Sequence, residues 1–520
     1  MKKETFFLCL VLTASALLRL MYCYDMPVSG DESISLLQAS GKAVVYHDKI
    51  SPMPMSGERI NHLVAYSDDY SVTEVLPSMR RAGMHPPLYY VFLHFVLKYA
   101  GNDILAVRLP SVLFSTLSIV LFYVLSKSLF PKIIALPAAI LLAFSPYGVH
   151  YAHMVRPYPL AMLLGLLSTW LAIRLYNRQT LKISSLDFWV YILTVIAGLY
   201  TIYHFAFVAI AQGVFLLLGF RHNNRRLLMI MCTPLLVLIF YLPWLPSMAE
   251  QMSVVRSGNF YFHGASNPLH VYRYFLEFDF TAALPGTYSW YKFVLAIALT
   301  ALIGLGGIWS LKTPAGRYFA VGLCAYLAFN LAADWILRTQ TLPISKLLFF
   351  IIPMLFLYLS TGISLVIQKR RMWGIASLAF VLAILALNSF ALVRHPAAED
   401  DPRHLALYRS FIAETTDPEG SDLVVVNEVT RRYLLPLAHT LSFSHLDFLA
   451  TEDILDALLN LDASGYSRIY AISPRYDNMF KPDVVSDLDL LMEHKGFVLE
   501  GSYLIPDHLR DKRLRFYKRH

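Results

Sequence analysis

Residues 133–176 contain two long apolar runs, IIALPAAILLAFSPYGVH (133–150) and PYPLAMLLGLLSTWLAIRLY (157–176), joined by the short segment YAHMVR (151–156). Runs of about 20 apolar residues match the hydrocarbon thickness of a bilayer. The segment therefore predicts two membrane-spanning helices with a short loop between them. Similar runs recur along the chain as far as residue 393.

We expect eleven membrane-spanning helices, near residues 5–24, 105–126, 133–150, 157–176, 187–203, 204–220, 227–247, 290–310, 317–337, 345–366 and 373–393. The first is interpreted as an uncleaved helix because its apolar stretch is long enough to span. The 520 residues are 57% hydrophobic and 15% charged, whereas soluble domains are about 45–50% apolar and about 25% charged. This composition excludes a soluble enzyme, a disordered chain and a disulfide scaffold.

The distribution of positive charge predicts the orientation of the helices. The net charge of +8 combines 29 Lys and Arg against 15 Asp and Glu in residues 1–393 with 15 against 21 in residues 394–520. We interpret PPLYYVFLHFVLKYA (86–100) as a short helix at the outer interface rather than a span. The basic residues of the inside segments are then Lys2, Lys3, Lys127, Lys132, Arg174, Arg178, Lys182, Arg221, Arg225, Arg226, Lys312, Arg317, Lys369, Arg370 and Arg371. Cytoplasmic loops are enriched in Lys and Arg, so we expect a cytoplasmic N-terminus, with the first loop (25–104) and the tail outside.

Residues 394–520 have the composition of a soluble domain. Strand-like runs at 422–427, 468–473, 497–505 and 513–518 alternate with helical patterns at 429–439, 451–460 and 484–494. Such alternation is typical of an α/β domain, and about 120 residues are enough for an independent fold. We therefore predict a polytopic α-helical membrane domain, 1–393, followed by an extracytoplasmic α/β domain, 394–520.

Two adjacent carboxylates, Asp31 and Glu32, follow the first predicted helix on the outer side. Carboxylates tied to a helix at the membrane boundary are well placed to act as a general base or to bind a cation. The alternative is a solvated acidic pair near the start of a helix.

Basic residues on the same face are candidates for binding a phosphate. His85 precedes Pro86 and Pro87, which favour a helix start, and anions bind at helix N-termini; the alternative is an aromatic belt with an incidental histidine. Arg156 lies in the 151–156 loop, and an arginine at this depth is a functional candidate with bidentate geometry for phosphate; the alternative is snorkelling to a lipid headgroup. Arg338 and Lys346 are further candidates, or ordinary interfacial anchors.

Five motifs in residues 1–180 together resemble the GT-C superfamily of membrane glycosyltransferases, in particular the branch of protein O-mannosyltransferases and lipid A aminoarabinose transferases. The motifs are Asp31-Glu32, His85-Pro86-Pro87-Leu88-Tyr89-Tyr90, Arg108-Leu109-Pro110-Ser111, Ser145-Pro146, and Tyr151 with Arg156-Pro157-Tyr158. The resemblance implies a bacterial inner-membrane enzyme that moves a sugar from a polyprenyl-phosphate carrier to an acceptor hydroxyl on a lipid, polysaccharide or protein at the outer face. We expect no nucleic-acid partner.

The resemblance also implies roles for individual residues. Asp31 would act as the base, with Glu32 in support. The residues that would bind the lipid phosphate or the sugar are His85, Tyr89, Tyr151, Arg156, Tyr158, Arg338 and Lys346. One displacement on an activated phosphate donor predicts inversion at the sugar carbon.

The sequence departs from the family pattern at two positions. Relatives carry an acid where this chain has Met154, which argues against a divalent metal; its candidate ligands here are Asp31 and His153. Relatives also carry an Arg-Tyr pair where this chain has Lys346-Leu347, which keeps a charge but loses the planar guanidinium. Two other classes stay open, namely a flippase or transporter of lipid-linked sugars and a catalytically inactive relative that binds the carrier lipid.

Overall fold

The computed structural model describes residues 2–21, 23, 28–43, 54–56, 71–82, 84–101, 103–178, 184–257, 269–281, 284, 289–337, 349–394, 421–427, 446–451, 458–474, 482–505 and 512–519. Contacts divide the chain into two units. The first comprises Met1–Cys23, Gly83–Tyr89 and Arg108–Arg394, and the second comprises Tyr24–Ala82, Tyr90–Val107 and His395–His520. The second unit thus contains the tail together with most of the predicted first outer loop.

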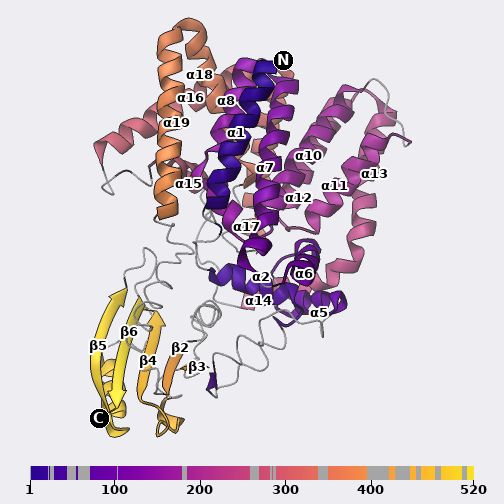
Figure 1. Cartoon of the computed structure of the whole chain (residues 1–520). Coiled ribbons are helices and arrows are strands. Elements are labelled where there is room, and N and C mark those ends of the chain that lie inside the picture. Colours follow the sequence, from indigo (N-terminus) through magenta and orange to yellow (C-terminus); the bar gives the residue numbers. More distant parts are fainter. Residues whose placement is uncertain are drawn as a thin grey trace. The chain divides into compact units, whose positions relative to one another are not determined.

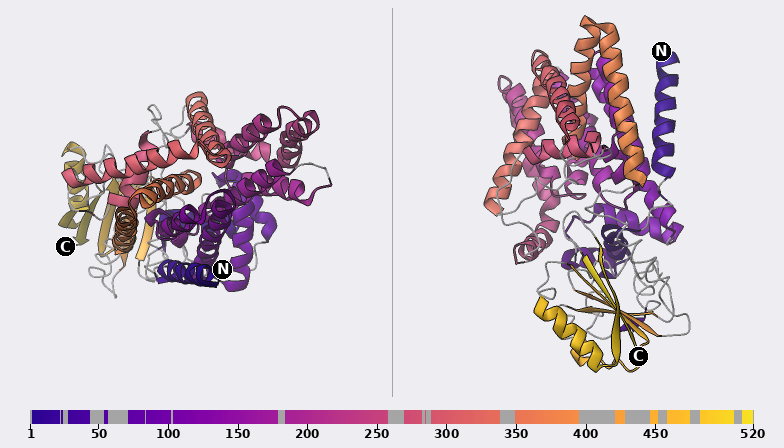
Figure 2. Two further views of the ribbon diagram at one scale, coloured as in Figure 1. Left: turned by 90° about the horizontal axis from the view of Figure 1, so that it is seen from above. Right: turned by 90° about the vertical axis from the view of Figure 1, so that its left-hand side faces the viewer.

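The first unit is a helical bundle (Figures 1 and 2). Its helices are α1 (Lys2–Met21), α7 (Ile104–Leu129), α8 (Lys132–Ala143), α9 (Pro146–His153), α10 (Tyr158–Asn177), α11 (Leu186–Leu199), α12 (Phe205–Phe220), α13 (Asn224–Tyr241), η1 (Leu242–Trp244), α14 (Leu245–Ser257), α15 (Leu269–Leu276), the π-helical turn η2 (Glu277–Thr281), α16 (Trp290–Ser310), α17 (Pro314–Leu337), α18 (Ile352–Lys369) and α19 (Arg371–Arg394). The first turns of α7 and all but the start of α6 (Leu88–Ala100) belong to the second unit.

Within the described residues, eight helices are long and apolar enough to cross a membrane, and the bent pair α8–α9 makes a ninth. Helices occupy all eleven predicted segments, but α11 and α12 have only 14 and 16 residues. At 1.5 Å per residue they reach about 21–24 Å, short of the roughly 30 Å bilayer core. As predicted, 86–100 contains a short helix, the 13-residue α6.

Close backbone contact joins α16 and α18. A Cβ atom added at Gly306 would lie 1.9 Å from the carbonyl oxygen of Tyr358, and one added at Gly362 would lie 2.0 Å from that of Leu302. Small residues let apolar helices approach this closely in a membrane. The contact therefore requires glycine on both helices and fixes α18, whose Phe356 is buried.

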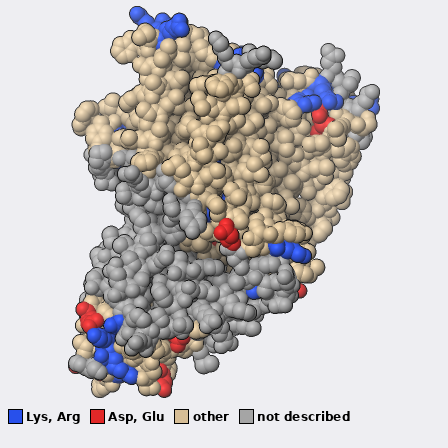
Figure 3. Space-filling view, in the orientation of Figure 1, with Lys and Arg blue, Asp and Glu red and all other residues tan. Residues whose placement is uncertain are grey.

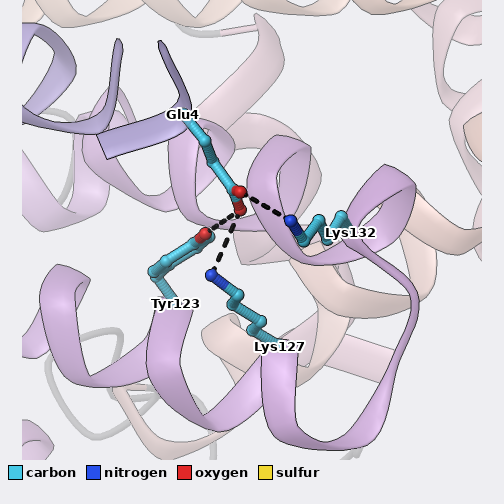
Figure 4. Close-up of polar contacts among 4 residues, drawn as sticks. All are labelled: Glu4, Tyr123, Lys127 and Lys132. Atoms are coloured by element: carbon cyan, nitrogen blue, oxygen red, sulfur yellow. Dashed lines mark hydrogen bonds and ion pairs between the residues drawn. The ribbon is translucent and has the colours of Figure 1, made fainter. Parts of the chain in front are cut away.

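An acid–base cluster joins the N-terminal end of α1 to α7 and α8 (Figure 4). The Glu4 carboxylate lies 3.3 Å from Lys127 Nζ and 2.8 Å from Lys132 Nζ and accepts a hydrogen bond from the Tyr123 hydroxyl. Lys and Arg gather at this end of the bundle (Figure 3). One carboxylate therefore pairs with the ammonium groups of two exposed lysines.

The second unit contains α2 (Gly30–Ala39), α5 (Val72–Ala82), α23 (Pro482–His494) and six strands. The strands are β1 (Met55–Ser56), β2 (Asp422–Asn427), β3 (Leu446–Thr451), β4 (Arg468–Pro474), β5 (Phe497–Ile505) and β6 (Lys512–Arg519). They are ordered β1-β3-β2-β4-β6-β5, with β3, β2 and β4 mutually parallel and the other pairs antiparallel. Leu488 and Met492 of α23 pack on one face against Leu423, Ile469 and Phe497, and α23 lies beside the sheet in Figure 2 (right).

Four predicted strands and the last predicted helix of the tail appear at β2, β4, β5, β6 and α23. Two strands were not predicted. β3 ends at Thr451, where the sequence pattern suggested a helix to begin, and β1 comes from the first loop and pairs Met55 with Phe448 and Ser56 with Asp447. The predicted helix at 429–439 lies outside the described residues.

Candidate functional site

Three of the predicted residues meet in the first unit. The Arg156 guanidinium Nη2 lies 3.3 Å from His85 Nε2 and donates to the Tyr158 hydroxyl at 3.3 Å. Its centre also lies 5.6 Å from the Tyr158 ring centroid, within range of a cation–π interaction. Arg156 is only 6% exposed. The structure thus assembles a buried guanidinium, an imidazole and a phenol from segments 71 residues apart.

The local backbone presents these side chains. α9 ends at His153, and the chain is extended at Met154 before α10 begins at Tyr158. Arg156 therefore lies in a short non-helical connection, where its side chain is not part of a helix face. On the other segment, Pro86 and Pro87 are buried, and the amide of Leu88 donates to the carbonyl of Tyr200 at 2.8 Å. This bond holds the start of α6 and the preceding His85.

Aromatic rings extend from this cluster into the bundle. The Tyr158 ring contacts those of Tyr151 and Phe349 at centroid distances of 5.5 and 6.0 Å. Phe349 in turn lines an apolar cavity between α7, α10, α12, α17 and α18, whose wall includes Phe350, Tyr318 and Gln212. The Tyr158–Phe349 contact therefore connects the Arg156 cluster to an apolar cavity.

A second group of basic side chains lies at the C-terminal end of α1. Arg19 is 1% exposed and donates to Ser115 Oγ at 3.0 Å and to the Ala143 carbonyl at 2.9 Å. Arg108, equally buried, donates to the carbonyl of Cys23. No role was predicted for Arg19, although an arginine inside a predicted span is a signal for structure or function. These bonds tie α1 to α7 and to the end of α8.

The described segment before α16 contains a buried acid that was not among the predicted site residues. Asp279 in η2 is fully buried, and its Oδ1 accepts hydrogen bonds from Ser145 Oγ at 2.7 Å and from the Tyr147 amide at 3.1 Å. Burial raises the pKa of Asp279 from its ordinary 3.8 to about 7. A lone acid in the apolar run YFLEFDF (274–280) was the available sequence signal.

Asp31 and Glu32 lie in the first turn of α2, in the second unit. The Glu32 carboxylate accepts from the Ser29 amide at 2.9 Å, while the Ser29 hydroxyl accepts from the Glu32 amide at 3.2 Å. This reciprocal pair is a capping box, so Glu32 is buried in the start of its own helix. Asp31 is half-buried beside it. Of the two acids, Asp31 has the more accessible side chain.

Of the three remaining residues predicted to bind the phosphate or the sugar, the structure describes only Tyr89. Tyr89 is fully buried, with its hydroxyl 3.4 Å from Ser111 Oγ. Arg338 and Lys346 lie outside the described residues. In the part of the chain that the structure describes, no three His, Cys, Asp or Glu side chains gather as metal ligands do. His153 is followed by the thioether of the buried Met154, a donor set that does not fit a divalent metal held by oxygen ligands.

Comparisons with known proteins support this architecture. Residues 84–246 match the family model described as dolichyl-phosphate-mannose-protein mannosyltransferase, whereas no curated protein sequence matches. The chain is similar to crystal structures of ArnT from Cupriavidus metallidurans, in the apo state and bound to undecaprenyl phosphate. Each is 11% identical over 98% of both chains, with TM-scores of 0.52 and 0.53. It is also similar to an Archaeoglobus fulgidus oligosaccharyltransferase complex with Zn and sulfate, at 11% identity and a TM-score of 0.50, over 95% of this chain and 71% of that chain.

The predicted fold class, a polytopic helical protein with a small C-terminal sheet, is confirmed by these similarities and by the apolar helices. The family-model match covers the segment that contains His85, Arg156 and Tyr158. The chain therefore has the fold of the GT-C membrane glycosyltransferases and resembles their mannosyltransferase branch.

Proposed function

We propose that this chain is a glycosyltransferase that moves a sugar from a polyprenyl-phosphate carrier to an acceptor hydroxyl on a lipid, polysaccharide or protein. The observation that carries the proposal is the cluster of the buried Arg156 and Tyr158 with His85, whose aromatic contacts lead to an apolar cavity. A polyprenyl phosphate has the matching chemistry, an anionic head on an apolar chain. The ArnT structure bound to undecaprenyl phosphate supports the same ligand class.

In the proposed reaction, Arg156 holds the carrier phosphate, and His85 and Tyr158 donate further hydrogen bonds to it. Cations placed in advance at developing charge are usually the largest catalytic contribution. Asp31 takes the proton from the acceptor hydroxyl as its oxygen attacks the sugar carbon. The bond from that carbon to the phosphate oxygen breaks, and polyprenyl phosphate leaves with the electron pair. A single displacement of this kind inverts the sugar carbon.

We further propose that the protein lies in a bacterial inner membrane with its N-terminus in the cytoplasm and residues 394–520 outside. The gathering of Lys and Arg at the N-terminal end of the bundle supports this orientation (Figure 3), because basic residues favour the cytoplasmic side. Arg338 and Lys346 stay candidates for additional phosphate contacts.

The test uses the purified full-length protein in lipid nanodiscs with a panel of radiolabelled polyprenyl-phosphate sugars and envelope fractions as acceptors. We expect release of free polyprenyl phosphate, labelled product and inverted configuration. Binding of the carrier without turnover would indicate an inactive relative, and movement of labelled lipid across proteoliposomes without product would indicate a transporter. A retained configuration would overturn the single-displacement mechanism.

Asp31→Asn tests the base. We expect it to abolish transfer while carrier binding and thermal stability stay at wild-type levels, because the amide cannot accept the proton. Asp103→Asn is the matched control: Asp103 is exposed and caps α7 through the Ala106 amide at 2.8 Å, and asparagine caps equally well. Near wild-type transfer by Asp31→Asn would show that another group is the base.

A further inference from the structure

Asp279 is a buried acid with no part in the reaction proposed above. It comes from the π-helical turn η2 and is fully buried. π-Helical turns are rare and are frequent at functional sites. Asp279 is more than 120 residues from Arg156 in the sequence. Its role therefore has to be read from the groups that donate hydrogen bonds to its carboxylate.

The Asp279 carboxylate binds the start of α9. Its Oδ1 accepts from the Ser145 hydroxyl and from the Tyr147 amide, while Ser145 Oγ accepts from the Gly148 amide at 3.2 Å. The first amides of a helix have no partner inside the helix, and an acidic group beside them stabilises the helix terminus. Ser145 and Asp279 thus cap α9 together.

The segment that carries Asp279 is itself anchored in the core. The rings of Phe275 and Phe280 lie 5.3 Å apart, and each contacts Phe356 of α18, at 5.3 and 6.3 Å. Both phenylalanines are buried, and η2 packs against α9 and α19. The carboxylate is therefore presented from a packed element rather than from a solvent-exposed loop.

The direction of α9 depends on contacts outside the α8–α9 pair. The two helices meet at a bend of 46°, so α9 is not held as a straight continuation of α8. Tyr151 lies on α9, and Arg156 follows its end by three residues. A change in the direction of this two-turn helix would move both side chains.

We infer that Asp279 is a positioning residue that holds α9 so that Arg156 and Tyr151 meet the carrier phosphate. The inference rests on the proposed function of Arg156 in binding that phosphate. Asp279 acts through hydrogen-bond acceptance at Oδ1, a role that an asparagine side chain can also fill. It touches neither the sugar nor the carrier.

The experiment compares Asp279→Ala, Asp279→Asn and Ser145→Ala in nanodiscs, with Thr281→Val as the matched control in the same turn. Binding of undecaprenyl phosphate is measured by titration, and the exchange of the 146–156 amides is measured by hydrogen–deuterium mass spectrometry. We expect Asp279→Ala to weaken carrier binding by about tenfold, the scale of one lost hydrogen bond, and to speed exchange in 146–156. Asp279→Asn should restore both, and Thr281→Val should change neither.

The double variant Ser145→Ala/Asp279→Ala tests whether the two residues act as one cap. We expect its loss of binding to be smaller than the product of the single losses, because coupled partners are not additive. Unchanged carrier binding in Asp279→Ala, or no rescue by Asp279→Asn, would overturn the inference. If the wild type fails to bind the carrier while Asp279→Ala still speeds exchange, the proposed function is wrong. Stabilisation of α9 by Asp279 would then still be supported.

Discussion

Two clusters of charged side chains in the bundle differ in burial and in the partners of their charged groups. At Glu4, one carboxylate is shared by Lys127 and Lys132, whose side chains are 40% and 64% exposed (Figure 4). At Arg156, a buried guanidinium contacts an imidazole and a phenol. Exposed ion pairs contribute little to stability. The Arg156 guanidinium, with the imidazole and the phenol beside it, is the group that we propose to bind an anion.

The largest effect is expected on substitution of Arg156. Arg156→Ala should lower the rate of transfer by about 100-fold or more, because a cation at developing charge contributes about this much, and should abolish binding of undecaprenyl phosphate. Arg225→Ala is the control, since Arg225 is exposed in the first turn of α13. Carrier binding and transfer by Arg156→Ala at near wild-type levels would show that Arg156 does not bind the carrier phosphate.

A smaller effect is expected at the neighbouring imidazole. His85→Ala should raise the carrier KM by about tenfold, the scale of one hydrogen bond to a charged group, with little change in kcat. His222→Ala, at an exposed histidine that contacts Arg221, serves as the control. Steady-state kinetics with an unchanged KM would leave Arg156 as the only phosphate contact of the pair.

Asp279 adds a pH dependence that the Glu4 cluster does not share. Because the pKa of Asp279 is raised from 3.8 to about 7 in the fold, its contribution to stability is complete below about pH 4 and is lost as the pH rises to about 7. The loss is on the order of a few kcal/mol. Asparagine does not titrate, so the thermal midpoint of the wild type should fall relative to Asp279→Asn between pH 5 and pH 8. Parallel curves for the two proteins would contradict this assignment.

The smallest effect is expected at Glu4. Glu4→Gln should lower the thermal midpoint slightly and leave transfer unchanged, because it leaves two solvent-exposed lysines without their acid. Salt screens exposed charges, so the difference from the wild type should shrink at high ionic strength. A large loss of transfer in Glu4→Gln would show that the two clusters are not functionally distinct.

Much of the fold was predictable because membrane helices are local features. Apolar runs predicted the helices, and Pro86 with Pro87 predicted the start of the short α6. The predicted end of α11 was four residues too late, since apolar composition continues through the turn at 200–204, whereas α12 begins within one residue of its predicted start. Strand β1 was not predicted because its two residues are too few to show the alternating pattern of a strand. They form one only by pairing with β3.

The candidate site was predictable only in its parts. His85, Arg156 and Tyr158 were expected to serve one phosphate, and the structure brings them together. Asp279 was missed because its partner Ser145 lies 134 residues away, and no spacing rule relates such positions. Arg19 was overlooked because two of its acceptors, Ser115 and Ala143, lie on the distant helices α7 and α8.

Composition and hydropathy thus established a helical membrane protein and the segments that carry its unusual charges, because partition into a bilayer depends on each segment's own side chains. Tertiary structure decided which of those charges meet, which are buried and which helix termini they cap. Hydrogen bonds between distant segments need atoms placed within about 3 Å, and only the packing of the whole bundle brings Asp279 to α9 and His85 to Arg156.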